Sequence, residues 1–406
     1  MSAISFDITA RSASCGARVG RVTTRHGSFD TPAFMPVGTR GSVKGIHPSD
    51  VAATGAQILL NNTYHLLLRP GAELIGRMGG VHRFMNWDGP ILTDSGGYQA
   101  FSLADANSVD DDGVTFKSHV DGATVRLTPE RAIEVQNLLG PDIIMAFDDC
   151  PPPIPEDDPA APVDPRRTAA ARRDSKRGVY DHAARLDVAN KRTIRWLERC
   201  VRAHGRPGEQ ALFGIVQGGA DLARREWCAA RVCGVDLPGY AIGGVAVGEP
   251  PEEIARIVRH TAPLLPEGRP RYLMGVGYER DLLAAVRAGV DMFDCVLPTR
   301  NGRNANAFTP TGQVRLRNLK FADDPLPIQP GCDCAACEPG RHGWGGHFSR
   351  AYIRHLFQCE EMLGPILVSL HNLRHFQRFM ADLRQTITKD DWQGFVTRYP
   401  VAAPGL

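Results

Sequence analysis

Leu212-Phe-Gly-Ile-Val-Gln217 is a short apolar run that ends in one polar side chain. Seven other runs of this kind recur along the chain: Phe34–Gly38, Gln57–Asn61, Pro90–Asp94, Ile143–Asp148, Tyr240–Gly244, Tyr272–Val276 and Asp291–Cys295. Runs this short and this apolar are typical of strands that are buried on both faces. The sequence therefore predicts eight buried strands.

Most of these runs are separated by stretches in which apolar residues recur with helical spacing. The clearest are Pro129–Leu139, Val188–Val201, Asp221–Val232 and Glu279–Ala288. Eight strands alternating with helices predict an α/β protein with a closed (β/α)8 TIM-type barrel. A doubly wound open sheet is the alternative, because periodicity says nothing about closure.

Polar residues or glycines stand at the carboxyl ends of the runs. They are Asn61, Asp94, Asp148, Gln217, Gly243 and Asp294. Barrel enzymes assemble their active sites at this end from several strands, which favours the barrel over the open sheet. Such a ring of polar groups suits one small planar ligand.

Three of the ten cysteines, Cys332, Cys334 and Cys337, lie within six residues of one another. Thiolates this close can converge on one tetrahedral Zn²⁺, and a fourth ligand would complete a structural site. The candidates for the fourth ligand are His342, His347, His355 and His371. Spacing alone does not choose among them.

The composition is that of an ordinary globular protein, with 406 residues of which 43% are hydrophobic and 23% charged. A formal net charge of +2 means that any nucleic-acid surface is a local patch. Residues 1–22 are interrupted by charges, and no later segment has the run of about 18 apolar residues that a membrane span needs. We therefore expect a cytoplasmic protein with no membrane contact.

Two carboxylates carry the chemical interpretation. Asp94 opens the string Asp-Ser-Gly-Gly-Tyr-Gln, and Asp294 is followed within nine residues by Arg300 and Arg303, which could grip phosphate. Acetal chemistry at a sugar uses two such groups, one as nucleophile on the anomeric carbon and one to move protons. The chain has no Walker A run, no G-x-S-x-G elbow, no H-x-H pair and no complete dinucleotide fingerprint.

The sequence resembles the queuine tRNA-ribosyltransferase family, in its bacterial tRNA-guanine transglycosylase branch. The resemblance covers nearly the whole chain and rests on seven strings in order, together with the cysteine cluster. The strings begin at Asn62 (NTYHL), Leu92 (LTDSGGYQ), Met145 (MAFDDC), Phe213 (FGIVQG), Ile242 (IGGVAVGE), Tyr272 (YLMGVG) and Asp291 (DMFDCVLPTR).

The resemblance implies that the enzyme exchanges the wobble guanine of tRNAs with GUN anticodons, those for Asp, Asn, His and Tyr. The incoming base would be 7-aminomethyl-7-deazaguanine, a queuosine precursor. By motif, Asp294 is the nucleophile that forms a covalent enzyme–RNA intermediate, and Asp94 is the acid/base. An RNA-binding subunit without activity is the alternative, and the presence of both carboxylates argues against it.

The resemblance also implies a set of binding residues. Asp148, Gln217 and the backbone of Gly244 would read the polar edge of guanine or its 7-deazaguanine replacement, between Tyr98 and Met274. The strand-end Gly243 belongs to the same pocket, and Val245 and Ala246 would offer carbonyls to the aminomethyl group. Cys150 and Val247 would leave too little volume for full queuine. Thr299, Arg300 and Arg303 would bind the tRNA anticodon loop.

For the C-terminal part, the resemblance implies that His371 is the fourth ligand of one structural Zn²⁺ per subunit, with His347 in reserve. It further implies a homodimer. We expect residues 1–317 to form the barrel, with an N-terminal extension and a loop insertion at 151–185. Residues 318–406 are then expected to form a zinc-binding subdomain and the helices that complete the barrel.

Three features depart from the family pattern. Asp149 stands where bacterial relatives usually carry glutamate, so we expect it to affect base discrimination. The region from Pro151 to Arg185, which begins with a proline-rich acidic stretch predicted to be a mobile loop, is longer than usual. Residues 338–348 form an insertion after the cysteines.

Overall fold

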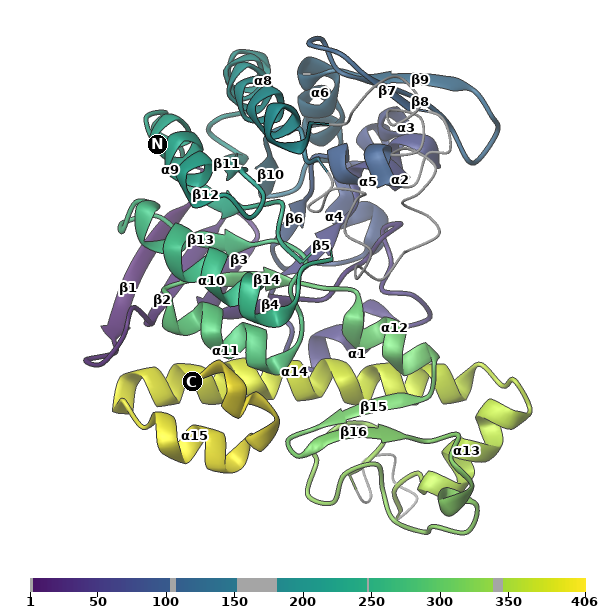
Figure 1. Ribbon diagram of the computed structural model, residues 1–406. Coiled ribbons are helices and arrows are strands. Elements are labelled where there is room, and N and C mark those ends of the chain that lie inside the picture. The colour runs from purple at the N-terminus through teal and green to yellow at the C-terminus, as the bar shows by residue number, and fades with distance from the viewer. Residues whose placement is uncertain (1–2, 103–106, 152–180, 247, 339–345) are drawn as a thin grey trace.

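The computed structural model describes residues 3–102, 107–151, 181–246, 248–338 and 346–406, and Figure 1 shows how they are arranged. One sheet of eight parallel strands lies at the centre. Its strands are β4 (Ala33–Met35), β5 (Leu59–Asn61), β6 (Ile91–Thr93), β10 (Ile143–Met145), β11 (Ala211–Val216), β12 (Gly239–Ile242), β13 (Arg271–Leu273) and β14 (Met292–Asp294). Each corresponds to one of the eight predicted runs, so that prediction is confirmed.

The sheet closes on itself. Its order is β4-β14-β13-β12-β11-β10-β6-β5, and Val37, just after β4, pairs in parallel with Leu60 of β5. The amide of Gly38 donates to the carbonyl of Leu60 at 2.7 Å, and the amide of Leu60 donates to that of Pro36 at 3.0 Å. The (β/α)8 barrel is therefore confirmed, and the open doubly wound sheet is wrong.

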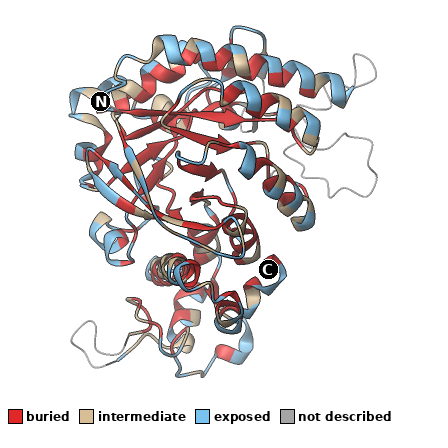
Figure 2. Ribbon diagram, turned by 90° about the vertical axis from the view of Figure 1, so that its left-hand side faces the viewer, coloured by how far each residue is buried: buried red, intermediate tan, exposed pale blue. Residues whose placement is uncertain are grey.

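Alternate side chains of each strand enter two different cores. Met145, Phe213 and Tyr272 belong to a cluster that fills the barrel. Their neighbours Ile144, Leu212 and Leu273 belong to a second cluster that includes the surrounding helices. Figure 2 shows these strands as a buried layer beneath helices with exposed outer faces. Burial on both faces explains why the strands read as continuous apolar runs.

Helices follow most of the strands and cover the barrel. Their bounds are α1 (Pro48–Ala53), α2 (Thr63–Leu68), α3 (Ala72–Arg77), α4 (Gly80–Met85), α5 (Gly97–Ser102), α6 (Pro129–Leu139), α8 (His182–Ala203), α9 (Leu222–Val232), α10 (Pro251–Thr261), α11 (Glu279–Arg287) and α12 (Leu297–Arg303). Local sequence sets the ends of α6. The hydroxyl of Thr128 accepts from the amide of Arg131, Pro129 takes the first position, and Gly140 ends the helix at φ 72°.

Two small antiparallel sheets extend the barrel. The first comprises β1 (Ser5–Arg11), β2 (Arg18–Thr24) and β3 (Gly27–Thr31), and the second β7 (Asn107–Val109), β8 (Val114–Lys117) and β9 (Thr124–Leu127). Val22 and Phe29 of the first sheet pack into the cluster that fills the barrel. Because β3 leads directly into the start of β4, this sheet covers the amino-terminal end and leaves the carboxyl ends of the strands for a site.

The C-terminal part packs against the barrel through one long helix. Its elements are β15 (Asn306–Thr309), β16 (Gly312–Arg315), α13 (Arg350–Gln358), α14 (Leu363–Lys389) and α15 (Trp392–Arg398), with short 3₁₀ turns at Leu319–Phe321 and Pro400–Gly405. Phe376 of α14, yellow in Figure 1, stacks on Phe34 of β4 with ring centroids 4.9 Å apart. At the crossing of α12 and α14, a Cβ on Gly302 would lie 2.7 Å from the Cα of Ser369, so only glycine fits there.

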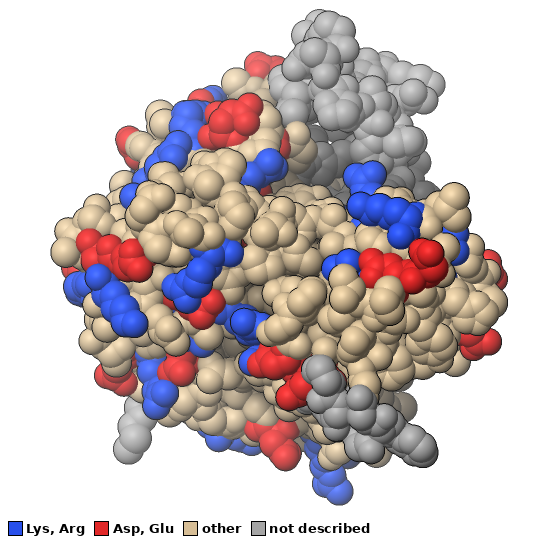
Figure 3. Space-filling view, turned by 90° about the horizontal axis from the view of Figure 1, so that it is seen from below, with Lys and Arg blue, Asp and Glu red and all other residues tan. Residues whose placement is uncertain are grey.

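Charges of both signs are interspersed on the face shown in Figure 3, in keeping with the small net charge. Among the described helices, none combines the length and the apolar character that crossing a membrane requires.

Candidate active site

Six of the predicted site residues lie at the carboxyl ends of the barrel strands. Asp294 is the last residue of β14, and Asp94, Gln217, Gly243 and Met274 directly follow β6, β11, β12 and β13. Asp148 comes three residues after β10. Because all eight strands are parallel, these ends meet at one mouth of the barrel.

Asp94 is buried and held by three donors. Its Oδ1 accepts from the backbone amide of Thr63 at 2.8 Å, and its Oδ2 accepts from the side-chain amides of Asn62 at 2.5 Å and Gln99 at 2.8 Å. Burial raises the pKa of Asp94 to about 6, and the negative charge of Asp294 contributes to the rise. Asp94 can therefore exchange a proton near neutral pH.

Asp294 is held through one of its two oxygens. Its Oδ1 accepts from the hydroxyl of Tyr272 at 2.6 Å and from the amide of Gly275 at 2.8 Å. Within the described residues, its Oδ2 accepts no hydrogen bond, and burial raises the pKa of the carboxyl group. An oriented carboxylate with one oxygen left over is the arrangement that a nucleophile needs.

Asp148 and Gln217 form a pair across neighbouring strand ends. The side-chain amide of Gln217 donates to Oδ2 of Asp148 at 2.6 Å, and the hydroxyl of Ser95 lies 3.4 Å from Oδ1. Burial raises the pKa of Asp148 to about 6, with a smaller contribution from the charge of Asp149. The carbonyl oxygen of Gln217 is buried and has no partner among the described residues. A buried acceptor without a donor indicates that a ligand supplies one.

The loop after β12 lies directly against Gln217. A Cβ on Gly244 would be 2.2 Å from the side-chain oxygen of Gln217, and one on Gly243 would be 2.7 Å from its nitrogen. Gly244 and Ala246 have φ angles of 60° and 59°. Because Gly243 and Gly244 carry no side chain, the backbone there approaches the Asp148–Gln217 pair more closely than any other residue would allow.

The remaining predicted pocket residues differ in exposure. Val245 is buried, Met274 and Cys150 are partly buried, and Ala246 and Tyr98 are exposed. Burial raises the pKa of Cys150 to about 12, so its thiol stays neutral. Val247 lies outside the described residues, as do His342 and residues 152–180, which make up most of the predicted loop insertion at 151–185.

The carboxylate of Asp149 points toward α8. It accepts from Arg185 at 2.6 and 3.0 Å and from Arg192 at 2.5 Å, and its side chain is completely buried. Asp149 therefore anchors α8 to the chain beside Asp148. These contacts connect Asp149 to the pocket through α8, and its expected effect on base discrimination stays a prediction.

The predicted RNA-binding residues lie on α12, directly after Asp294. Arg300 is exposed and Arg303 partly exposed, and among the described residues neither forms an ion pair. Burial and the neighbouring charge of Arg300 lower the pKa of Arg303. Thr299 is buried, and its hydroxyl donates to the carbonyl of Val296 at 3.3 Å. Of these three residues, the two arginines have side chains that reach solvent.

Three cysteines and one histidine form a buried cluster in the C-terminal part that could hold a metal ion. Nδ1 of His371 lies 3.7, 3.4 and 3.5 Å from the sulfurs of Cys332, Cys334 and Cys337. Tetrahedral Zn²⁺ with ordinary bond lengths places sulfur and nitrogen ligands about 3.5 Å apart, so the four groups fit this ion. Nε2 of His371 bonds to the carbonyl of Phe308 at 2.8 Å, which turns Nδ1 toward the thiols.

The other described histidine candidates have different partners. Nε2 of His347 lies 2.7 Å from the carbonyl of Pro325, and His355 lies beside Cys359. Among the candidates in the described part of the chain, His371 is therefore the histidine that lies beside the three thiols, because α14 packs next to them. A second group, His26, His82 and Asp142, could also contact one ion, but the Asp142 carboxylate already accepts from both imidazoles and from the amide of Ile91.

Several residues of the site were not singled out from the sequence. Asn62, Gln99 and Tyr272 hold the two carboxylates, and each lies inside a string already noted for other reasons. Arg225 was also missed, although α9 gives a signal for it. The buried positions Cys228, Ala229 and Val232 have helical spacing, and the same spacing extended backward reaches Arg225.

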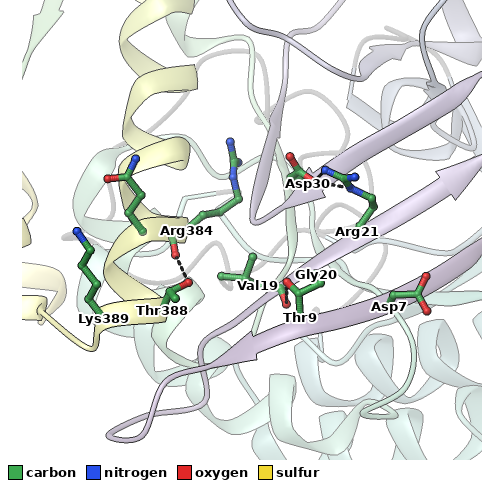
Figure 4. Close-up of a pocket in the computed structure, with 10 residues that line it drawn as sticks. Asp7, Thr9, Val19, Gly20, Arg21, Asp30, Arg384, Thr388 and Lys389 are labelled. Carbon is green, nitrogen blue, oxygen red and sulfur yellow. Dashed lines mark hydrogen bonds and ion pairs between the residues drawn. The ribbon is translucent and has the colours of Figure 1, made fainter.

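A hollow of about 650 Å³ lies elsewhere, between the N-terminal sheet and α14 (Figure 4). Arg384 and Lys389 line it from α14, and Asp7, Arg21 and Asp30 from the strands, with Arg21 paired to Asp30. It lies beside the sheet that covers the amino-terminal end of the barrel. It contains none of the predicted site residues.

Comparison with known proteins points to one family. The family model described as queuine tRNA-ribosyltransferase matches residues 13–185 and 178–403. A queuine tRNA-ribosyltransferase of Thermus thermophilus is 49% identical over 395 residues, which are 97% of this chain and 93% of that protein. Relatives with the same description from Symbiobacterium thermophilum and Herpetosiphon aurantiacus are 49% and 50% identical, over 95% and 94% of this chain and 88% of each relative.

Proposed function

Because the chain belongs to the queuine tRNA-ribosyltransferase family, we propose that it replaces the wobble guanine of tRNAs with GUN anticodons by 7-aminomethyl-7-deazaguanine. Family membership makes it a tRNA-guanine transglycosylase, a pentosyltransferase of queuosine synthesis. The tRNAs would be those for Asp, Asn, His and Tyr. The observation that carries this proposal is the presence of two carboxylates, the buried Asp94 and the partly buried Asp294, beside the Asp148–Gln217 pair at one barrel mouth.

The exchange has two displacement steps at the ribose. Oδ2 of Asp294 attacks the anomeric carbon, the bond from that carbon to N9 breaks, and Asp94 gives the departing guanine a proton at N9. A covalent enzyme–RNA ester results. The incoming base then returns its N9 proton to Asp94, N9 attacks the same carbon, and Asp294 leaves. A pKa of about 6 suits Asp94 to both proton transfers.

The pocket chemistry suits a flat base with donors on one edge and a carbonyl on the other. The carboxylate of Asp148 would accept from the N1–H and 2-amino groups, and the buried oxygen of Gln217 would accept a further N–H. The backbone at Gly244 would donate to the 6-oxo group. Tyr98 and Met274 would cover the two ring faces.

The choice of incoming base rests on the volume near its 7-position. Cys150 would leave room for a small aminomethyl group and would clash with the cyclopentenediol of queuine, a mismatch that typically costs about 1–3 kcal/mol. Carbonyls near Val245 and Ala246 would accept from the protonated amine. Val247, the second residue expected to limit this volume, lies outside the described residues.

The target guanine must leave its stack to reach the barrel mouth, so flanking phosphates need anchors. Arg300 and Arg303 would supply them. We also propose that the metal held by Cys332, Cys334, Cys337 and His371 is one structural Zn²⁺, since four protein ligands leave no open position. A barrel of residues 1–317 with a subdomain of residues 318–406, and assembly of two copies into a homodimer, complete the proposal.

Incorporation of radiolabelled guanine into unmodified tRNA(Tyr) by the purified chain alone tests the proposal. We expect label to enter this tRNA and not a matched tRNA with adenine at the wobble position. We further expect 7-aminomethyl-7-deazaguanine to displace the label irreversibly and queuine to do so poorly. A chain that binds the tRNA in a gel but incorporates nothing would be an RNA-binding subunit, and the proposal would be wrong.

A further inference from the structure

Arg225 of α9 is a fully buried arginine whose partners are backbone carbonyls. Its Nε donates to the carbonyl of Gly219 at 2.8 Å, and its Nη1 to those of Val216 at 3.3 Å and Gly243 at 2.8 Å. Its Nη2 donates to the carbonyl of Gly244 at 2.9 Å. Among the described residues, no carboxylate forms an ion pair with it. A single guanidinium thus joins the loop after β11 to the loop after β12.

A buried charge without a counter-ion is an unusual way to fill the space between a helix and a barrel. Removing a cation from water costs several kcal/mol, and apolar side chains of similar size often serve better in such places. The next two buried positions of the same stripe, Cys228 and Ala229, are small and uncharged. Packing alone therefore does not explain the guanidinium, and its hydrogen bonds to backbone carbonyls indicate a second role.

The contacts fix the direction of two peptide groups. In a trans peptide, the carbonyl and the following N–H point in opposite directions. When Arg225 holds the carbonyls of Gly243 and Gly244, the amides of Gly244 and Val245 must point away from it. Neither amide donates a hydrogen bond within the described part of the chain. The left-handed φ of 60° at Gly244 lets both carbonyls turn to the same side.

Gly244 lies between Arg225 and the base-reading residue Gln217. A Cβ added to Gly244 would be 3.7 Å from Nη2 of Arg225 and 2.2 Å from the side-chain oxygen of Gln217. The oriented amides thus belong to the loop that borders the Asp148–Gln217 pair. Two neighbouring amides without an acceptor form a concavity suited to one carbonyl oxygen.

We propose that Arg225 is a positioning residue for base recognition, which holds the amides of Gly244 and Val245 toward the 6-oxo group of the bound base. The inference rests on the proposed function, because it takes guanine-like bases as the ligands of this pocket. Arginine is required since its planar fork reaches four carbonyls at once, whereas the single nitrogen of lysine cannot. Arg225 itself does not touch the base.

The test compares Arg225→Lys and Arg225→Gln with a matched control, Arg18→Lys. Arg18 is also buried and also donates to two carbonyls, those of Glu267 and Arg269, but it begins the second strand of the N-terminal sheet and pairs with Asp291. For each protein, the KM for guanine, the KM for tRNA, kcat and the melting temperature are measured. Guanine is then compared with 2,6-diaminopurine, which carries an amine in place of the 6-oxo group.

We expect Arg225→Lys to raise the KM for guanine by about tenfold or more, with little change in the KM for tRNA. The preference for guanine over 2,6-diaminopurine should shrink by a similar factor. Arg18→Lys should lower the melting temperature and leave both quantities unchanged. Arg225→Gln provides the same readouts if the lysine variant does not fold.

The proposal would be overturned if the Arg225 variants had a lower melting temperature but kept the wild-type KM for guanine and the wild-type preference for guanine over 2,6-diaminopurine. Failure of both variants to fold while Arg18→Lys folds would also overturn it, because the role of Arg225 would then be structural. Guanine incorporation by the wild-type protein distinguishes failure of this proposal from failure of the proposed function. If wild type incorporates no guanine, the proposed function is wrong, whatever the variants do.

Discussion

The hydroxyl of Tyr272, on β13, donates a 2.6 Å hydrogen bond to Oδ1 of Asp294, at the end of β14. Burial raises the pKa of Tyr272 well above its usual value of 10, and the charge of Asp294 adds to the rise, so the hydroxyl remains a donor at any working pH. The amide of Gly275 donates to the same oxygen, so the carboxylate is fixed and Oδ2 is the oxygen that would attack in the proposed exchange.

Replacing this donor should slow the chemical step. In Tyr272→Phe the carboxylate of Asp294 keeps only the bond from Gly275, so its attack geometry is less well defined. A hydrogen bond to a charged group is worth about 1.5–3 kcal/mol, and we expect kcat to fall by roughly tenfold or more. The KM for tRNA should change little. Steady-state rates of guanine exchange at varied tRNA concentration give both values, and an unchanged kcat would mean that Tyr272 does not orient the nucleophile.

Binding of the free base should weaken as the pH falls through about 6. Asp148 must be ionised to accept two N–H groups, and its pKa is raised to about 6. Below that pH the protonated fraction grows, and the affinity for guanine should fall by about tenfold per pH unit. Above pH 7 it should be constant.

Calorimetric titrations with guanine between pH 5 and pH 8 would measure this dependence. Asp148→Asn should bind weakly at every pH, without the decline. Asp94 also has a pKa of about 6, so Asp94→Asn is the matched control and should keep the decline. If the dependence disappeared in Asp94→Asn and persisted in Asp148→Asn, the assignment of the two carboxylates would be reversed.

Asp149 should matter for stability more than for the choice of base. Asp149→Ala would leave Arg185 and Arg192 without their shared, fully buried partner. Breaking a buried ion pair typically costs about 3–5 kcal/mol, and urea unfolding should show a loss of that order. The ratio of guanine to 7-aminomethyl-7-deazaguanine incorporation should stay at the wild-type value. A changed ratio in a variant of full stability would support the effect on base discrimination expected from the sequence.

Metal removal should unfold the C-terminal part before it affects chemistry. Cys332, Cys334 and Cys337 lie in the same buried cluster as Ile353, Leu356 and Val368, so the ligands are part of its core. Cys337→Ser, or treatment with a strong chelator, should lower the melting temperature, while exchange at low temperature persists. Elemental analysis of freshly purified protein should find one zinc per chain. Its absence, with an unchanged melting temperature, would refute the metal assignment.

The barrel could be predicted because its strands are buried on both faces. A strand such as Ala211–Val216 must then be apolar throughout, and the first polar residue after it, Gln217, marks the strand end. Closure was predicted from the alternation of strands and helices and from the polar strand ends, but the pairing of Val37 with Leu60 that completes it was not, since no local pattern encodes a contact between distant segments. The order of strands and helices favoured a barrel without requiring one.

For the site, the positions of the residues could be predicted from the sequence, but the directions of their side chains could not. Strand ends located Asp94, Asp148, Gln217 and Asp294, because parallel strands bring their carboxyl ends to one mouth. The direction in which a side chain points depends on packing between distant segments, which the sequence does not give. Asp149 follows Asp148 in sequence and turns to α8 instead, and Arg224 pairs with Asp187 and Asp221 while its neighbour Arg225 enters the core. Each pair of neighbours has the same residue type, so the two members can be distinguished only by their contacts in the folded structure.

Trapping the covalent enzyme–RNA intermediate tests the central claim most directly. Wild-type protein incubated with unmodified tRNA(Tyr), without free base, and then denatured should yield a tRNA adduct whose peptide, by mass spectrometry, carries the ribose on Asp294. Asp294→Asn should form no adduct, and Tyr272→Phe should form it more slowly. An adduct located on Asp94, or guanine exchange at the wild-type rate in Asp294→Asn, would contradict the account.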